Sequence, residues 1–301
     1  MTTKGTLVVI GGPTASGKTH AAATLAHALG TEVISADSRQ FYRAMRIGTA
    51  RPLEEELLGV RHHFLGHLEL SEMWSAGEFA RAAEPVLQRL LKEHGTAMLV
   101  GGSGLYIDAL IKGLDPMPAT DTRVREHLQQ RFQQYGLPPL LSELEQLDHE
   151  TWLHIDRYNP HRVIRALEVC HITGRPYSAQ RTTPQDRTDV RIVRMAMDVP
   201  RPQLYAQIDE RVDRMLAAGL EEEARALLPH RHLNALRTVG YRELFDHFDG
   251  LLSLPAAVDL IKQHTRNYAK RQMTWLRRDA EWHWCTPTDH AAMHALATAH
   301  P

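Results

Sequence analysis

The stretch GGPTASGKTH, residues 11 to 20, follows the apolar run LVVI. It satisfies the pattern G-x-x-x-x-G-K-[ST], whose fixed positions here are Gly12, Gly17, Lys18 and Thr19. In such a loop backbone N–H groups surround phosphate oxygens, the lysine neutralises a terminal phosphate, and the threonine hydroxyl can ligate Mg²⁺. The stretch therefore predicts a phosphate-binding loop. The loop alone does not decide whether the phosphate it holds is transferred or simply leaves.

The first 115 residues alternate short apolar runs with helical patterns. Buried strands that end in Gly or Asp are predicted at three runs: LVVIGG (7–12), EVISAD (32–37) and AMLVGG (97–102). Helical patterns separate them, at residues 18–30 and 75–95. Strands that alternate with helices form a parallel sheet covered on both faces, and ligands bind at the C-terminal ends of its strands. We therefore expect an α/β fold with a P-loop NTPase-like core.

The pattern changes at about Pro116, where strand-like runs disappear. Helices are predicted there at residues 120–136, 138–148 and 159–174. The apolar run VRIVRMAMDV (190–199) then restores a strand, and two amphipathic helical patterns follow it, at residues 201–219 and 254–278. The sequence therefore predicts a discontinuous catalytic core of residues 1–115 and 190–301, interrupted by an all-helical insertion domain at residues 116–189.

The composition excludes several classes of protein. The 301 residues are 43% hydrophobic, which is enough for a sizeable core. No apolar run reaches the roughly 18 residues that a membrane span needs, and the N-terminus lacks the pattern of a signal peptide, so we expect a cytoplasmic protein without a membrane partner. Two cysteines, Cys170 and Cys285, cannot form a disulfide framework, and the pair His62 and His63 lacks the further ligands of a zinc site.

The net charge of −1 conceals two basic tracts. Eight arginines and three acids lie between Arg157 and Arg194, and six lysines or arginines and no acid lie between Lys262 and Arg278. Such tracts fit a polyanion-binding face, because lysine and arginine neutralise phosphates, but they also fit ordinary solvated helix surface. Charge alone does not decide between the two interpretations.

Two further strand ends carry candidates for chemistry. Asp37 ends the second predicted strand beside the phosphate loop, where a carboxylate can accept a proton or a hydrogen bond from an attacking group. It could also cap a helix that begins at Ser38. The third strand ends in GGSGLYI (101–107), where a ligand could approach the backbone and Ser103 could bond to it, although the segment also fits a plain strand-to-helix turn.

The end of the third strand also disfavours one class of enzyme. A nucleotide hydrolase usually has an acid at such a position to hold Mg²⁺, whereas this run ends in Gly101 and Gly102. No arginine-rich lid precedes the helical segment either. Both features argue against an ATP-consuming enzyme, although a small-molecule kinase with Asp37 as its base stays open.

The motifs along the chain, taken together, resemble those of one family. They are GPTASGKT, ISADSRQFYR, MRIGTARP, RHHF, WSAGEFA, LVGGSGLYI, NPHRVIRALEV, RTVGYRE and YAKRQMTWLRR, and they span roughly Leu7 to Arg278. Their order and spacing are similar to those of the bacterial-type tRNA dimethylallyltransferases, also called tRNA isopentenyltransferases. The resemblance implies transfer of a dimethylallyl group from dimethylallyl diphosphate to N6 of the adenine just 3′ of the anticodon, in tRNAs that read codons beginning with U. Diphosphate is then released.

The resemblance also implies roles for individual residues. The diphosphate would be held, with Mg²⁺ on Thr19, by Gly12, Pro13, Thr14, Ala15, Ser16, Gly17, Lys18 and Thr19. The implied catalytic residues are Asp37, Ser103 and Arg211. The implied tRNA contacts are Asp37, Ser38, Arg39, Gln40, Ser103, Arg125, His161, Arg162, Val163, Ile164, Arg165, Arg237, Thr238, Val239, Gly240, Tyr241 and Arg242.

The roles implied for Arg211 and Ser103 can be compared with the sequence around them. The resemblance makes Arg211 a ligand of the leaving diphosphate, and the alternative is an ion pair along its own helix. The residues three and four positions away are not acidic, which weakens that alternative. Ser103 stands where threonine is expected in most relatives, so the hydroxyl is kept and a methyl group is lost.

Four functions are consistent with these features. The leading hypothesis is a tRNA-modifying prenyltransferase, and the alternatives are an isopentenyltransferase acting on free adenine nucleotides, a small-molecule kinase, and a regulatory protein without chemistry. The basic tracts favour tRNA over a free nucleotide. We expect a monomer without an obligate protein partner, because no long apolar surface pattern demands one.

Overall fold

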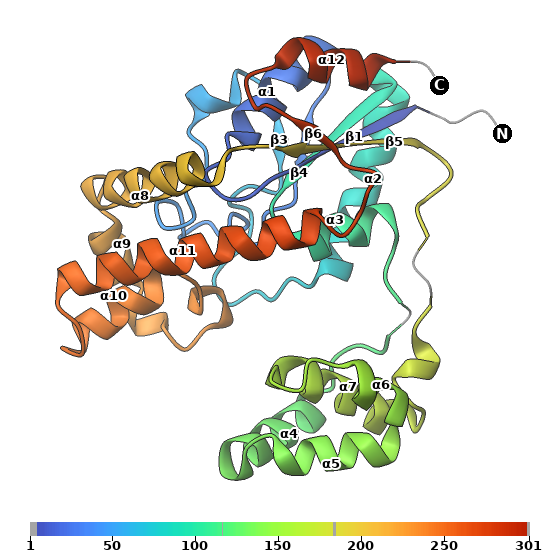
Figure 1. Ribbon diagram of the computed structural model, residues 1–301, viewed down its shortest axis with the longest axis vertical. Coiled ribbons are helices and arrows are strands. Elements are labelled where there is room, and N and C mark those ends of the chain that lie inside the picture. The colour runs from blue at the N-terminus through green and yellow to red at the C-terminus, as the bar shows by residue number, and fades with distance from the viewer. Residues whose placement is uncertain (1–4, 116, 183–184, 300–301) are drawn as a thin grey trace. The chain divides into compact units, whose positions relative to one another are not determined.

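The computed structural model describes residues 5–115, 117–182 and 185–299 (Figure 1). The chain divides into two compact units. Unit 1 comprises residues 1–111 and 187–301, and unit 2 comprises residues 112–186. The expected domain boundaries, at residues 116 and 189, lie a few residues further along the chain.

Unit 1 is built on a parallel sheet. Its strands, in the order β3-β2-β4-β1-β5-β6, are β1 (Thr6–Gly11), β2 (Val33–Ser35), β3 (His62–His63), β4 (Thr96–Gly101), β5 (Arg191–Met197) and β6 (His283–Cys285). The four strands expected from apolar runs are confirmed, whereas β3 and β6 are too short to stand out in the sequence. Gly11 pairs with Gly101 and with Ala196, so three neighbouring strands end at one edge of the sheet. Ligands bind at this edge in parallel sheets.

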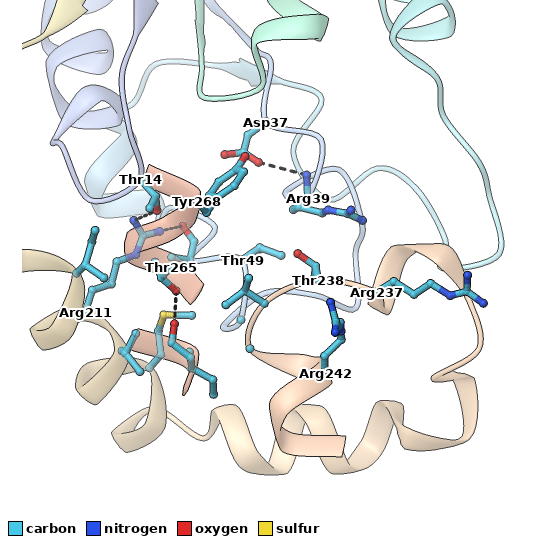
Figure 2. Close-up of a pocket in the computed structure, with 18 of the residues that line it drawn as sticks. Thr14, Asp37, Arg39, Thr49, Arg211, Arg237, Thr238, Arg242, Thr265 and Tyr268 are labelled. Carbon is cyan, nitrogen blue, oxygen red and sulfur yellow. Dashed lines mark hydrogen bonds between the residues drawn. The ribbon is translucent and has the colours of Figure 1, made fainter. Parts of the chain in front are cut away.

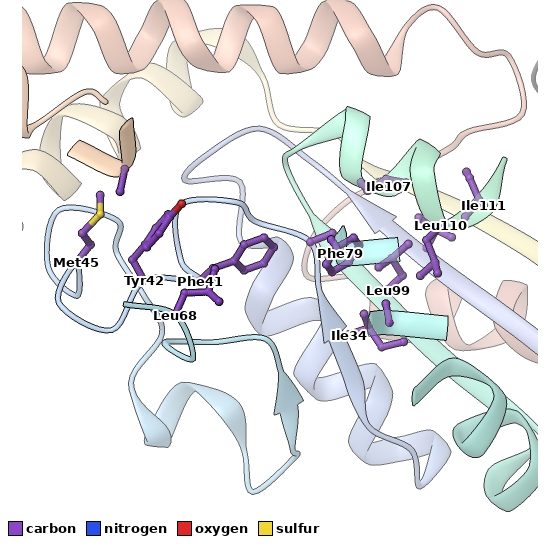
Figure 3. Packing of buried hydrophobic residues seen from close by; sticks show 14 of the residues in the cluster. Ile34, Phe41, Tyr42, Met45, Leu68, Phe79, Leu99, Ile107, Leu110 and Ile111 are labelled. Atoms are coloured by element: carbon purple, nitrogen blue, oxygen red, sulfur yellow. The ribbon is translucent and has the colours of Figure 1, made fainter. Parts of the chain in front are cut away.

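Helices cover both faces of this sheet. Successive side chains of a strand point to opposite faces, so Val8 and Ile10 pack with α1 (Lys18–Leu29) and α12 (His290–Thr298). Leu7 and Val9 join a second cluster with α2 (Ala76–His94) and α3 (Gly104–Ile111). Figure 3 shows side chains of this second cluster, among them Phe79 of α2. The cores on the two faces hold the loops at the C-terminal edge in place.

Four further helices of unit 1 pack on one another beyond that edge (Figure 1). They are α8 (Arg201–Ala217), α9 (Leu220–Leu227), α10 (Tyr241–Phe248) and α11 (Leu254–Leu276). The amphipathic patterns at residues 201–219 and 254–278 correctly predict α8 and α11. These helices matter for function because they carry polar side chains from the last third of the chain to the phosphate loop.

Unit 2 is helical within its described residues, as expected from the sequence. Its helices are α4 (Thr122–Tyr135), α5 (Pro138–Leu147), α6 (His149–His154) and α7 (Pro160–Thr173). A small core formed by Leu128, Leu140, Leu144 and Leu167 holds α4, α5 and α7 together. No helix in the described ranges of either unit is long and apolar enough to cross a membrane.

Candidate active site

The phosphate loop connects β1 to α1 as the motif predicts. Gly17 precedes the helix with a φ of 79°, in the left-handed region that glycine adopts without strain. The Lys18 ammonium is buried and donates to the Pro13 carbonyl over 3.3 Å. Burial lowers the pKa of Lys18 to about 8, although the nearby Asp37 carboxylate favours its charged form. An anion bound in the loop would therefore stabilise a buried cation.

Two cavities adjoin the loop. The first, which we call the Asp37 cavity, has a volume of about 290 Å³ (Figure 2). Its lining is rich in arginine and comprises Thr14, Asp37, Arg39, Gly48, Thr49, Ala50, Ile208, Arg211, Val212, Met215, Arg237, Thr238, Val239, Gly240, Arg242, Ile261, Thr265, Tyr268 and Arg271. A carboxylate among so many cations suits a site that binds a polyanion and handles a proton.

The second cavity, the loop cavity, has a volume of about 460 Å³. It is lined by residues 15–20 of the phosphate loop and by Arg46, Ile47, Ala50, Arg51, Pro52, Leu53, Glu56, Gln207, Arg211, Arg214, Met215 and Ala218. Lys18 and four arginines face one glutamate there, so the charge of this cavity suits a diphosphate. Ala50, Arg211 and Met215 line both cavities and form the boundary between them.

Arg211 reaches this boundary from α8. Its guanidinium donates to Thr14 Oγ1 over 3.1 Å and to the Ala50 carbonyl over 3.4 Å (Figure 2). Both acceptors are neutral, so they orient the guanidinium without cancelling its charge. Burial lowers the pKa of Arg211, and the Asp37 carboxylate acts in the opposite direction. The structure thus places Arg211 against the phosphate loop.

Asp37 follows β2 and lines the Asp37 cavity. Its Oδ1 accepts a hydrogen bond from the Arg39 backbone N–H over 3.2 Å. The segment 38–41 is a turn, so the alternative role of Asp37 as the cap of a helix beginning at Ser38 is wrong. An aspartate commonly closes such a turn with its own side chain, which leaves one carboxylate oxygen available to a ligand.

Ser103 supports its neighbours at the end of β4. Its Oγ accepts from the Ser38 backbone N–H over 3.2 Å and lies 3.3 Å from Ser38 Oγ. It also interacts with Tyr268, whose pKa is raised to about 12 by burial and by the nearby Asp37 carboxylate. Tyr268 lines the Asp37 cavity, whereas Ser103 lines neither of the two cavities. In this structure Ser103 therefore fixes the turn after Asp37.

Arg39 and Gln40, which are expected to contact tRNA beside Asp37, also form hydrogen bonds within this region. The Arg39 guanidinium donates to the carbonyls of Asn234 and Ala235. The Gln40 amide donates to the carbonyls of Thr49 and Ala50, over 3.1 and 3.0 Å. Arg39 lines the Asp37 cavity, and Gln40 holds Thr49 and Ala50, which line it as well.

The segment 237–242 contributes five lining residues of the Asp37 cavity: Arg237, Thr238, Val239, Gly240 and Arg242. Tyr241 was expected to contact RNA, and this expectation is wrong. Its side chain is fully buried and its hydroxyl donates to Glu223 over 2.7 Å. Tyr241 packs inward because it lies on the same face of α10 as Leu244 and Phe245, and all three belong to one hydrophobic cluster.

In unit 2 the expectation that residues 161–165 all contact RNA is partly wrong. His161 and Arg162 are exposed at the start of α7, but Val163 and Ile164 are buried in the core of the unit. Arg165 is half-buried and pairs with Glu168 over 3.0 Å. Helix periodicity explains this division, since the face that holds Val163 and Leu167 must pack against α4 and α5.

Arg125 shares the same buried partner. Its guanidinium lies 2.5 Å from the Glu168 carboxylate, whose side chain is 0% exposed. Glu168 also accepts from the Asp121 backbone N–H over 3.1 Å. A carboxylate removed from water needs such partners, so Arg125 and Arg165 both neutralise Glu168 inside unit 2.

Gln272 supports the phosphate loop and was not predicted from the sequence. This residue of α11 is 5% exposed, accepts from the Thr14 backbone N–H over 2.8 Å and donates to the Gly102 carbonyl over 2.9 Å. A side chain at Gly102 would meet the Gln272 amide at 2.1 Å, which explains why β4 continues into glycine there. The available signal is that Gln272 lies between Ala269 and Leu276 on the apolar face of the helix, where a polar residue needs partners.

Comparison with known proteins places this site in a family. The IPP transferase family model matches residues 40–279. The tRNA dimethylallyltransferase 1 of Bacteroides thetaiotaomicron is 42% identical over 282 residues, covering 94% of this chain and 92% of the relative. The tRNA dimethylallyltransferase of Cytophaga hutchinsonii is 44% identical over 281 residues, with coverage of 93% and 92%. The chain belongs to the IPP transferase family.

A solved structure of this family has the same fold. The full-length tRNA isopentenylpyrophosphate transferase of Bacillus halodurans is 35% identical and superposes with a TM-score of 0.70, over 97% of this chain and 96% of that one. IPP transferases of this kind are prenyltransferases with a P-loop NTPase-like fold, so this chain is an enzyme of that class. The family resemblance seen in the sequence motifs is confirmed.

Proposed function

We propose that this enzyme transfers the dimethylallyl group of dimethylallyl diphosphate to N6 of the adenine 3′-adjacent to the anticodon of tRNA, in tRNAs that read codons beginning with U. One observation carries the proposal: half-buried Arg211 lies between a phosphate-loop cavity and a cavity that contains the Asp37 carboxylate, and it lines both. This arrangement allows a diphosphate on one side and an adenine amino group on the other. A cytoplasmic monomer without an obligate protein partner is part of the same proposal.

The reaction exchanges two bonds at one carbon. The allylic C1–O bond to the diphosphate breaks, the N6–C1 bond forms, and N6 loses one proton. Negative charge grows on the departing diphosphate, where the loop N–H groups, Lys18 and Arg211 would stabilise it. Asp37 would accept a hydrogen bond from N6 and then its proton, as the amine becomes acidic only during attack.

Mg²⁺ fits the residues at the mouth of the loop. A space of about 10 Å³ is lined by Thr19 and Ser35, which carry hydroxyl groups, and by Lys18 and Asp37, and the Thr19 hydroxyl would be the protein ligand of the ion. Mg²⁺ prefers oxygen ligands and usually keeps waters and substrate oxygens as well. When bound there, the ion would neutralise charge on the diphosphate.

The acceptor adenine must leave the stack of the anticodon loop to reach Asp37. Extrusion costs a few kcal/mol and is least costly in a single-stranded loop. The arginines around the Asp37 cavity suit the phosphates of the neighbouring nucleotides. His161 and Arg162, exposed on unit 2, are proposed to contact the same RNA.

The proposal is tested with labelled dimethylallyl diphosphate and two acceptors, unmodified tRNA and AMP. Label on tRNA supports it. Label on AMP and not on tRNA would assign the enzyme to free adenine nucleotides, and label on neither would exclude prenyl transfer to adenine.

A further inference from the structure

The turn formed by residues 46–50 is a shared wall of the two cavities. Arg46 and Ile47 face the loop cavity, Gly48 and Thr49 face the Asp37 cavity, and Ala50 lines both. The Ala50 carbonyl accepts from Arg211 over 3.4 Å and from the Gln40 amide over 3.0 Å. The position of this turn therefore sets the position of a carbonyl that orients Arg211.

One side chain holds the opposite side of the turn. Glu223 of α9 accepts from the backbone N–H groups of Arg46, Ile47 and Gly48 over 2.9, 2.8 and 2.9 Å. The Tyr241 hydroxyl donates to the same carboxylate over 2.7 Å. Three successive N–H groups that converge on one carboxylate form a strong, charge-assisted clasp.

The turn has little freedom to settle elsewhere. A side chain at Gly48 would meet the Tyr241 ring at 2.5 Å, so the backbone of the turn lies directly against that ring. Tyr241 follows Gly240, which lines the Asp37 cavity. The Glu223 carboxylate thus joins α9, the start of α10 and the turn into one support.

We propose that Glu223 is a positioning residue for the transfer reaction: by clasping residues 46–48 it fixes the Ala50 carbonyl and, through it, the Arg211 guanidinium at the diphosphate. The inference rests on the proposed function. Of the consecutive glutamates 221–223, Glu223 alone makes these contacts to the turn, and Glu222 is exposed.

The alternative is that Glu223 only stabilises the fold. The two roles differ in their coupling to Arg211. If Glu223 acts through Arg211, its replacement has little further effect once Arg211 is gone. If it is merely structural, its replacement costs the same whether or not Arg211 is present.

The test is a double-mutant cycle with Glu223→Gln and Arg211→Ala. Gln keeps the size of Glu but turns an NH₂ group toward backbone N–H groups, so at least part of the clasp is lost. The measurements are kcat/KM for dimethylallyl diphosphate with saturating tRNA, the Kd of inorganic diphosphate and the Kd of tRNA. Glu222→Gln is the matched control.

Glu223→Gln should lower kcat/KM and weaken diphosphate binding by about tenfold or more, because small misplacements of catalytic groups are costly, and leave the Kd of tRNA within about twofold. In the Arg211→Ala background the same change should have less than about a twofold effect. An equal loss in both backgrounds, or no loss in either, would overturn the inference. If the wild-type protein does not modify tRNA, the proposed function fails, and the diphosphate Kd still tests the coupling.

A second variant applies if Glu223→Gln does not fold. Gly48→Ala leaves the carboxylate in place but pushes the turn away from Tyr241. It should give the same loss and the same dependence on Arg211. A fully active Gly48→Ala enzyme whose turn is displaced would contradict the proposal.

Discussion

Gln272→Leu tests how the end of the chain supports the phosphate loop. The change removes two hydrogen bonds, from the Thr14 N–H to Gln272 and from Gln272 to the Gly102 carbonyl. Each is worth about 1 kcal/mol net, and a buried carbonyl left without a partner adds about 1–3 kcal/mol. We therefore expect the free energy of unfolding to fall by roughly 3–5 kcal/mol.

Thermal unfolding gives the first readout. For a folded unit of this size 1 kcal/mol corresponds to about 2–4 °C, so the Tm should fall by roughly 6–20 °C. The matched control is Gln263→Leu, at an exposed position of the same helix, which should shift the Tm by less than about 2 °C. Gln272→Glu keeps the acceptor for the Thr14 N–H but places an oxygen against the Gly102 carbonyl, so it should also destabilise the protein.

Steady-state kinetics gives the second readout. Thr14 also accepts from Arg211, so releasing its backbone should disturb the diphosphate site more than the RNA site. We expect kcat/KM for dimethylallyl diphosphate to fall about tenfold while the Kd of tRNA changes by less than about twofold. A Gln272→Leu enzyme as stable and as active as the Gln263→Leu control would show that Gln272 does not support the phosphate loop.

Three further predictions concern the remaining charged groups. Asp37→Ala should lower the transfer rate by about 10² or more and leave tRNA binding intact, and near-normal turnover would exclude a role in proton transfer. The pKa of Lys18 is about 8 in the folded protein and 10.5 ordinarily, so the unfolded state binds more protons between these pH values and the stability of the free enzyme should rise there. Diphosphate affinity, measured by calorimetry, should fall above pH 8 in the wild type and not in Lys18→Gln. Arg162→Ala should weaken tRNA binding and lower the slope of log K against log salt concentration by about 1, without changing the Tm. Arg165→Ala should lower the Tm, because it removes a partner of buried Glu168. The opposite pattern would reverse the roles of the two arginines.

The parts of the site that the sequence predicts are local. The phosphate loop follows from eight consecutive residues, because a fixed spacing of glycines and Lys18 determines the backbone path between strand and helix. Asp37 is predictable for a similar reason, since strand ends in a parallel sheet meet at one edge. Arg211 needed the family resemblance, because nothing in α8 alone points to the loop.

The supporting residues could not be predicted because their partners are distant in sequence. Gln272 bonds to a loop residue 258 positions earlier, and Glu223 clasps a turn about 175 positions earlier. Nothing local to either residue reveals such a partner. In contrast, Arg165 and Glu168 pair at a spacing of three on one helix, a local pattern that could be predicted, although Arg165 was expected to contact tRNA instead.

The resemblance also assigned whole segments where the structure divides them. Val163, Ile164 and Tyr241 lie within expected RNA-binding segments, yet helix periodicity turns these three side chains into the core. A motif shared by relatives contains residues that hold the fold as well as residues that bind the ligand.

In the proposed reaction the phosphate loop holds a leaving group. The most direct measurement follows diphosphate release and N6-dimethylallyladenosine formation in one reaction with unmodified tRNA, using nucleoside analysis by mass spectrometry. We expect one released diphosphate for each modified adenine, at the position 3′ of the anticodon and with no requirement for ATP. Phosphate transfer from ATP without adenine modification would contradict it.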